Sequence, residues 1–239
     1  MKPKTFLLTD QLSYRSMTIE LHVGSEDDYE EFVIQKDRAT RHSKLIQKAL
    51  DPGKGWKESK EGIIRLPEES PRAVEMFGVF INTGHLHLTI PNQEQGGKTS
   101  APESQEDIWA LLEDAWLLGE HLLSTEFKDA VVDELLDQLR STAEVPKKMH
   151  EAIYGGSIGA SGMRRLLVDL TVFTWFPDEL GEQRPDPACA EYFKEVAVAA
   201  MKRHSCGVVN SAPFDRADAG CSYHDHGKDI DCYKTMFKA

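Results

Sequence analysis

The stretch from Gly62 to Gly84 constrains the fold more than any other part of this chain. It begins with the apolar run IIRL, which predicts a buried strand. Ser70 then provides a helix N-cap, and Pro71 stands at the first helical position, where its missing N–H costs nothing. Six apolar residues at three- and four-residue spacing predict one broad buried helical face: Ala73, Val74, Met76, Phe77, Phe80 and Ile81. Neighbouring segments are therefore expected to cover this helix on several sides.

The residues before this stretch predict a hairpin followed by helix. Met17 to Val23 alternates apolar and polar residues, so Met17, Ile19, Leu21 and Val23 are expected to face the core. A turn is predicted at Gly24–Asp28, and Glu31–Gln35 is predicted as the return strand. Lys36–Leu50 follows as a helical region in two pieces.

Beyond Gly84 the pattern changes from strand to helix. Leu86–Ile90 predicts one more short strand, and the polar segment Pro91–Glu106 predicts a surface loop. Ser104 and Asp107 resemble a capping box that opens a helix. Further helices are predicted at Thr125–Arg140, Lys147–Tyr154, Met163–Phe176 and Ala188–Arg203. Strands come early and helices late, which favours an α+β fold.

This order divides the chain into four parts. We expect an N-terminal arm at 1–16, an α+β domain at 17–140, a helical extension at 141–204 and an irregular Cys/His tail at 205–239. The segment Ser141–Pro146 is the predicted domain boundary.

Composition excludes some classes of function. The chain has 239 residues and a net charge of -12, which argues against general nucleic-acid binding and against anionic membrane surfaces. No run of about 18 apolar residues predicts a membrane span, and the apolar run near the N-terminus is too short for a signal peptide. The protein is therefore expected to be intracellular, in the cytoplasm or nucleus.

All four cysteines lie in the last quarter of the chain, at Cys189, Cys206, Cys221 and Cys232. In a reducing compartment they are expected to be free thiols or metal ligands. Two of them combine with two histidines in the pattern Cys-x-x-His-x-His-x5-Cys: Cys221, His224, His226 and Cys232. Two Cys and two His can complete a tetrahedral structural zinc site. The alternative is that Tyr223 and Tyr233 simply dock the tail. No other cofactor is expected.

A second motif, Gly155-Gly156-Ser157-Ile158-Gly159, matches the G-x-S-x-G nucleophile elbow. That elbow requires a strand before it and a helix after it, and the preceding residues are too short for such a strand. We therefore expect a glycine hinge, and a hydrolase that uses Ser157 is the lesser alternative.

Four segments together resemble the BTB/POZ domain, in the form common in filamentous-fungal proteins. They are IELHVG at 19–24, EFVIQKD at 31–37, the block from Trp56 to Gly84, and LLEDAWLLGEHLL at 111–123. Their order and spacing agree with the family over residues 17 to about 140. The resemblance implies a BTB/POZ fold, a small mixed sheet capped by a helical cluster, here with a C-terminal helical extension.

The resemblance also implies a function without catalysis. Members of this family are protein–protein interaction modules, and many are substrate adaptors for cullin-type ubiquitin ligases. Adaptor members have a hydrophobic-x-Glu motif before the third strand, which Trp56-Lys57-Glu58 matches. Trp56 could fill a groove on a partner or fold back on its own domain. Scaffolding in transcriptional regulation, with no DNA contact of its own, is the alternative role.

The chain departs from the family at the positions that usually hold its homodimer together. Thr18 and His42 stand where family dimers have an Asp and an Arg, and Gln35 replaces the usual His. Both members of a buried charge pair are therefore missing together, so neither charge is orphaned. This weakens the expectation of the usual homodimer.

Overall fold

The computed structural model of the chain describes residues 17–25, 28–88, 90–91, 99–100, 104–142, 144–175, 189–205, 212–216, 219–227 and 230–237. The predicted arm at 1–16, most of the predicted loop at 91–106 and Cys206 lie outside these residues. The protein is α+β, as predicted, and it forms two compact units. The first comprises Met1–Ala130 together with Asp231–Ala239, and the second comprises Val131–Ile230.

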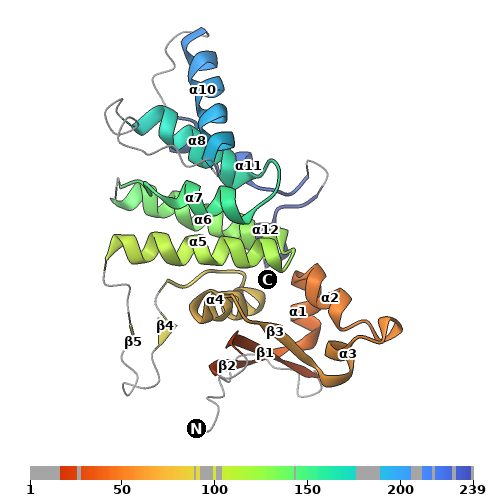
Figure 1. The fold of residues 1–239 in the computed structure, drawn as a ribbon. Coiled ribbons are helices and arrows are strands. Elements are labelled where there is room, and N and C mark those ends of the chain that lie inside the picture. The colour runs from red at the N-terminus through yellow and green to blue at the C-terminus, as the bar shows by residue number, and fades with distance from the viewer. Residues whose placement is uncertain are drawn as a thin grey trace. The chain divides into compact units, whose positions relative to one another are not determined.

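A three-stranded sheet with the order β2-β1-β3 lies in the first unit (Figure 1). β1 (Thr18–Ser25) pairs antiparallel with β2 (Asp28–Gln35) and parallel with β3 (Ile63–Leu66). The predicted hairpin and the predicted strand after Gly62 are both confirmed, and the sheet is mixed. Alternate residues of β1 are buried, as its pattern predicts, but Met17 precedes the strand and is 71% exposed. The expectation that Met17 faces the core is therefore wrong.

The helical region after the hairpin has two pieces, as predicted. α1 (Lys36–His42) and α2 (Lys44–Ala49) are separated by Ser43, which adopts an extended backbone. The Ser43 hydroxyl accepts a hydrogen bond from the Ile46 N–H and donates one to the Leu122 carbonyl at 2.7 Å. One serine thus ends α1, caps α2 and ties both to a later segment. The short helices η1 (Pro52–Lys54) and α3 (Lys57–Glu61) lead into β3.

The central helix α4 (Pro71–Thr83) has the predicted boundaries. Pro71 opens it, and Gly84 closes it with a left-handed backbone at φ 74°. Its apolar face is fully buried, and Phe77 and Phe80 both contact the ring of Phe127. The sequence pattern predicted this burial because a helix with so wide an apolar face cannot lie at the surface.

The predicted strand at Leu86–Ile90 is wrong over its first part. Residues 85–88 form no strand, and only β4 (Ile90–Pro91) pairs, with β5 (Thr99–Ser100). Alternation of apolar and polar residues describes the faces of a segment, but a strand also needs a partner to pair with.

Two long helices, α5 (Gln105–His121) and α6 (Thr125–Thr142), follow this segment, as the sequence predicts. α5 opens with the predicted capping box between Ser104 and Asp107. α6 follows after a tight turn. The second unit begins within α6, at Val131, whereas the sequence places the boundary about ten residues later, at Ser141–Pro146.

The chain's last residues belong to the first unit. α12 (Tyr233–Met236) and the following Phe237 pack on α4, with ring centroids 6.0 Å apart for Phe80 and Tyr233 and 5.5 Å apart for Phe80 and Phe237. Phe237 also stacks on His42, with centroids 5.4 Å apart. A Cβ at Gly84 would lie 2.2 Å from the Phe237 ring, so this ring occupies the space that a side chain at position 84 would take.

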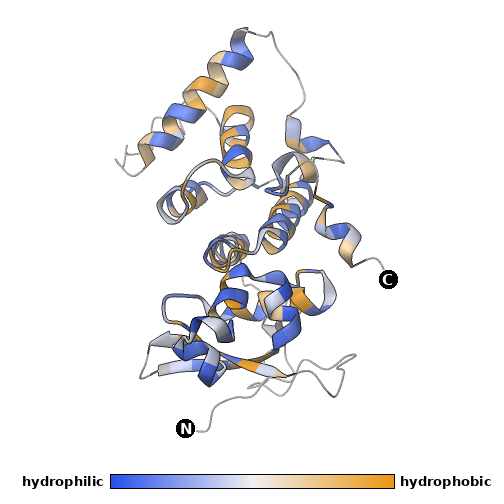
Figure 2. Cartoon of the chain, turned by 90° about the vertical axis from the view of Figure 1, so that its right-hand side faces the viewer, coloured by the Kyte–Doolittle hydropathy of each residue, from blue (hydrophilic) through white to orange (hydrophobic). Residues whose placement is uncertain are grey.

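The second unit is helical. It contains the end of α6, followed by α7 (Met149–Gly156), α8 (Gly162–Thr174), α10 (Ala190–Ser205), η4 (Pro213–Asp215) and α11 (Gly220–Tyr223). Apolar and polar residues alternate along α10 (Figure 2). The tail at 205–239, which the sequence predicted as irregular, contains the short helices η4, α11 and α12.

A buried arginine organises the centre of this unit. Arg164 is almost wholly buried, and its guanidinium donates to the Ser157 carbonyl at 2.6 Å and pairs with Glu191 at 2.9 Å. The same group lies 4.2 Å from the Tyr154 ring centroid, a cation–π geometry. Because a buried charge is costly unless it is paired and hydrogen-bonded, these contacts hold α7, α8 and α10 in one arrangement.

Candidate metal centre

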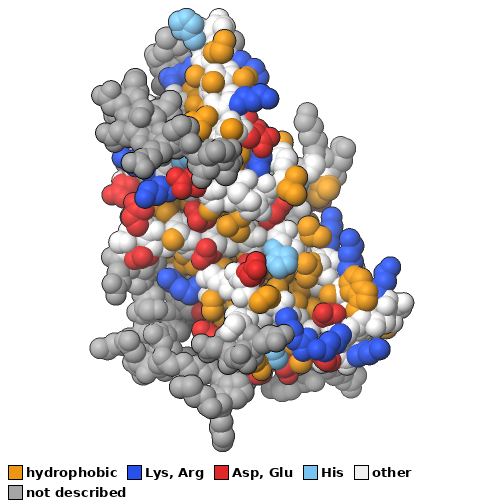
Figure 3. Space-filling view, in the orientation of Figure 1, with side chains coloured by type: hydrophobic (Ala, Val, Ile, Leu, Met, Phe, Trp, Pro, Cys, Tyr) orange, Lys and Arg blue, Asp and Glu red, His pale blue; other side chains and the backbone are white. Residues whose placement is uncertain are grey.

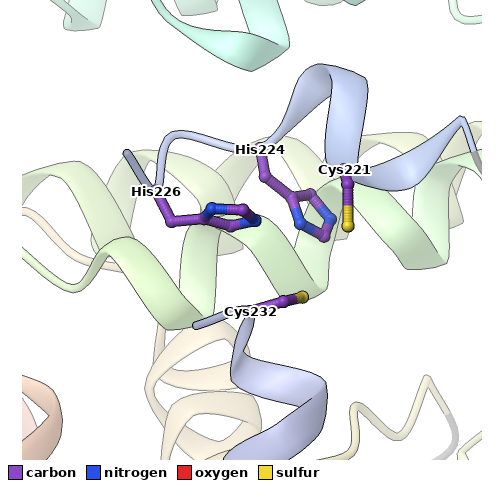
Figure 4. Close-up of side chains that lie close together, drawn as sticks. All are labelled: Cys221, His224, His226 and Cys232. Carbon is purple, nitrogen blue, oxygen red and sulfur yellow. The ribbon is translucent and has the colours of Figure 1, made fainter. Parts of the chain in front are cut away.

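The four predicted metal ligands lie together in the structure. One ligand atom from each of Cys221, His224, His226 and Cys232 lies within 4.8 Å of every other. The four side chains point toward a common centre (Figure 4). The cluster could hold a metal ion: two thiolates and two imidazoles are the ligand set of tetrahedral Cys2His2 sites.

Contacts with α8 hold the first part of this cluster in place. The Tyr223 hydroxyl donates to the Asp169 carboxylate at 2.7 Å, and the Asp225 carboxylate accepts from the Gly162 N–H at 2.5 Å. Arg165 donates to the carbonyls of Ser222 and His224. Burial, followed by the Asp169 carboxylate, raises the pKa of Tyr223, so its hydroxyl keeps its proton and continues to donate. These contacts hold the backbone at 222–225 against α8.

His226 has one nitrogen engaged and one available. Its Nδ1 lies 3.2 Å from the Gly227 carbonyl oxygen, which can only accept a hydrogen bond. Its Nε2 is buried and makes no hydrogen bond within the described residues. Buried polar atoms of native proteins nearly always have a partner. A buried ring nitrogen without one, aimed at two cysteines and a second histidine, fits a metal ligand.

Tyr223 and Tyr233 are both buried, as expected if the two tyrosines dock the tail. The two interpretations of the tail are therefore compatible, because docking by the tyrosines accompanies the convergence of the four ligands. Cys189, in contrast, is buried at the start of α10 and takes no part in the cluster.

The predicted partner-binding residues lie at the start of α3. Trp56 is its N-cap residue and is 47% exposed, Lys57 is exposed and Glu58 is half-buried. Lys57 pairs with Glu61 at 3.7 Å. The Trp56 ring thus remains accessible at the surface of the first unit.

Ser157 does not have the geometry of a nucleophile elbow. It follows helix α7, where that motif requires a strand, and it is buried. Its hydroxyl donates to the Ile153 carbonyl at 2.5 Å and accepts from Arg164 Nε at 3.1 Å. Of the glycines expected to form a hinge, Gly155 and Gly156 are in the last turn of α7, and Gly159 lies between α7 and α8 with a left-handed backbone at φ 80°.

His42, where the chain departs from the BTB/POZ pattern that it resembles, has a partner within the first unit. It is buried and hydrogen-bonded to Glu126 in α6, within the same chain. Thr18 is exposed at the start of β1. The His42 side chain thus has its hydrogen-bond partner within the same chain.

The structure also groups Glu20, His22 and Glu31, which sequence reasoning missed. The hairpin register places His22 opposite Glu31, so strand alternation combined with the correct register could have found them. His22 pairs with Glu20 at 3.2 Å and stacks on Tyr29. These contacts account for the group as a cross-strand cluster.

No protein-family model matches this chain, and no curated protein matches it either. Among the described helices, none is long and apolar enough to cross a membrane. The resemblance to BTB/POZ domains therefore stays a prediction from the sequence.

Proposed function

We propose that Cys221, His224, His226 and Cys232 form a structural zinc site. The observation that supports it is the spacing of the four ligand atoms, all within 4.8 Å of one another. Zinc bonds of about 2.0–2.3 Å in a tetrahedron place neighbouring ligand atoms roughly 3.3–3.8 Å apart. Small side-chain movements would therefore close the cluster around an ion.

Four protein ligands leave no open coordination position, so this zinc would stabilise structure and would not activate water. It would close the segment from Cys221 to Cys232 into a short loop. Because metal binding to such a segment contributes directly to folding free energy, chelation should loosen it.

Metal analysis of protein purified without chelator tests this proposal. We expect close to one equivalent of zinc in the wild type and a large loss in Cys221→Ser and Cys232→Ser. Cys189→Ser is the matched control, because Cys189 lies outside the cluster, and it should retain its zinc. Wild-type protein without near-stoichiometric zinc would overturn the proposal.

We further propose that the protein is a non-enzymatic interaction module with a BTB/POZ fold in its first unit, and that it acts as a substrate adaptor for a cullin-type ubiquitin ligase. The mixed sheet, the central helix α4 and the exposure of Trp56 support this proposal. An exposed Trp at a loop-to-helix junction is the kind of residue that dominates binding energy when it fills a partner's groove.

The surroundings of Trp56 indicate the chemistry of the partner. Although the chain is acidic overall, the segment around Trp56 carries exposed lysines at 44, 48, 54, 57 and 60. Basic side chains gather over this side of the first unit, around α1 to α3 (Figure 3). A partner with an apolar groove and an acidic rim would match this surface, since complementary charge speeds association and selects partners.

A pull-down from the native cell tests the adaptor proposal. Wild-type protein should recover a cullin, and Trp56→Ala and Glu58→Ala should lose it. Tyr29→Ala, which also truncates an exposed aromatic residue, is the control and should behave as the wild type. Absence of cullin from the wild-type sample would refute the adaptor role, and recovery of transcription regulators in its place would support the alternative of a scaffold.

A further inference from the structure

The ring of His224 lies against a carboxylate of α6. Its side chain is 0% exposed, and its Nε2 lies 3.1 Å from the Asp133 carboxylate, an ion-pair distance without hydrogen-bond alignment. Asp133 comes from α6, far from the tail in sequence. The negative carboxylate repels a lone pair on the nearest ring nitrogen and attracts an N–H, so we place the proton of a neutral His224 on Nε2. Nδ1 is then the nitrogen that would bind a metal.

His226 shows the opposite arrangement. Its Nδ1 faces the Gly227 carbonyl, so its Nε2 is left as the ligand nitrogen. The two histidines would therefore bind one ion through different nitrogens. Each tautomer is set by the atom that faces the other ring nitrogen.

Gly220 lets α11 approach Asp133 closely enough for this contact. A Cβ at position 220 would lie 2.1 Å from Asp133 Oδ1 and 3.4 Å from His224 Nε2. The absence of a side chain at position 220 therefore leaves room for the carboxylate and the imidazole side by side.

We infer that Asp133 is a positioning residue for the metal centre: it orients His224, selects Nδ1 as the ligand atom and makes that nitrogen a stronger donor. This inference rests on the proposed zinc site. Carboxylates that accept from the second nitrogen of a ligating histidine typically change metal affinity by about 10–100-fold when they are removed.

Zinc affinity of the full chain, measured by competition with a chromophoric chelator, tests the inference. We expect Asp133→Ala to weaken zinc binding by about 10–100-fold, and Asp133→Asn, which keeps an accepting oxygen without the charge, to weaken it less. Asp137→Ala is the matched control, because Asp137 lies one turn further along α6, is exposed and pairs with Arg140. It should bind zinc as tightly as the wild type.

A second measurement separates positioning from a general loss of stability. Two-bond proton–nitrogen correlation spectra of zinc-loaded protein report which imidazole nitrogen carries the proton. In the wild type we expect His224 to be protonated at Nε2 and His226 at Nδ1. Binding of both histidines through Nε2 would overturn the inference.

The two proposals fail in different ways. If the wild type binds no zinc, the proposed metal centre itself is wrong. If the wild type binds zinc and Asp133→Ala binds it equally tightly, the zinc site stands and the role of Asp133 is wrong.

Discussion

Gly162 lies against the backbone carbonyl of Tyr223 so closely that a Cβ on Gly162 would fall 1.5 Å from that oxygen. This contact brings the first turn of α8 directly onto the end of α11, within the second unit. The Asp225 carboxylate accepts from the Gly162 N–H in the same place. A glycine at position 162 therefore allows the tail to pack directly against the start of α8.

Replacing this glycine should be costly, although alanine favours helices. Gly162→Ala forces two backbone segments apart, and we expect it to lower the free energy of unfolding by about 1–3 kcal/mol. Gly155→Ala is the matched control, because Gly155 is helical and has open space around it. It should raise stability by about 0.5–1 kcal/mol. Equal stabilities of the two variants, measured by denaturant unfolding, would contradict the contact.

Leu123 occupies a position that normally belongs to glycine. Its φ is 52°, and the N–H groups of Leu123 and Ser124 bond back to the carbonyls of Glu120 and Gly119, which is a Schellman motif at the end of α5. The side chain is about half exposed, so its strain is poorly offset by burial.

Asparagine tolerates this left-handed conformation better than leucine, and valine tolerates it worse. We expect Leu123→Asn to stabilise the protein by up to about 1 kcal/mol and Leu123→Val to destabilise it. Thermal unfolding of the two variants measures this difference. A reversed order of their midpoints would show that Leu123 contributes packing that outweighs the strain.

His150 should make the second unit sensitive to acid. It is buried and stacks on Tyr192 at 4.2 Å. Burial lowers its pKa below the ordinary value of 6.5, although the Glu151 carboxylate and a backbone hydrogen bond at Lys147 act in the opposite direction. The unfolded chain therefore binds more protons at His150 than the folded chain over a range below pH 6.5.

The His150 contribution to stability is thus fully present above pH 6.5 and is lost as the pH falls through the folded pKa. His150→Phe keeps an aromatic ring and removes the titration, so it should lose less stability than the wild type between pH 7 and pH 5. Unfolding midpoints across this range measure the effect. His85→Gln changes an exposed histidine and should follow the wild-type curve.

Phe237 should contribute to the stability of the first unit despite its place near the end of the chain. Its ring packs on His42 and Phe80 and is partly buried. We expect Phe237→Ala to cost about 1–2 kcal/mol, less than a fully buried Phe. Met236→Ala is the neighbouring control, since Met236 is exposed. Identical unfolding curves for Phe237→Ala and the wild type would rule out this packing.

The sequence by itself determined the elements whose signals are local. Pro71 and Gly84 delimit α4, and Ser104 with Asp107 opens α5, because backbone sterics and capping bonds act over a few residues. The spacing of Cys221, His224, His226 and Cys232 likewise indicated a metal cluster, since all four ligands lie within twelve residues of one another.

Only the tertiary structure decided the contacts between distant segments. No pattern in the tail indicates that His224 meets Asp133, that Gly162 touches Tyr223, or that Phe237 fills the space beside Gly84. Hydrophobic periodicity tells which face of a helix is buried, but not which surface covers it. That choice depends on the shapes of two surfaces packing together, and it places the residue that orients His224 on a different helix from the ligand itself.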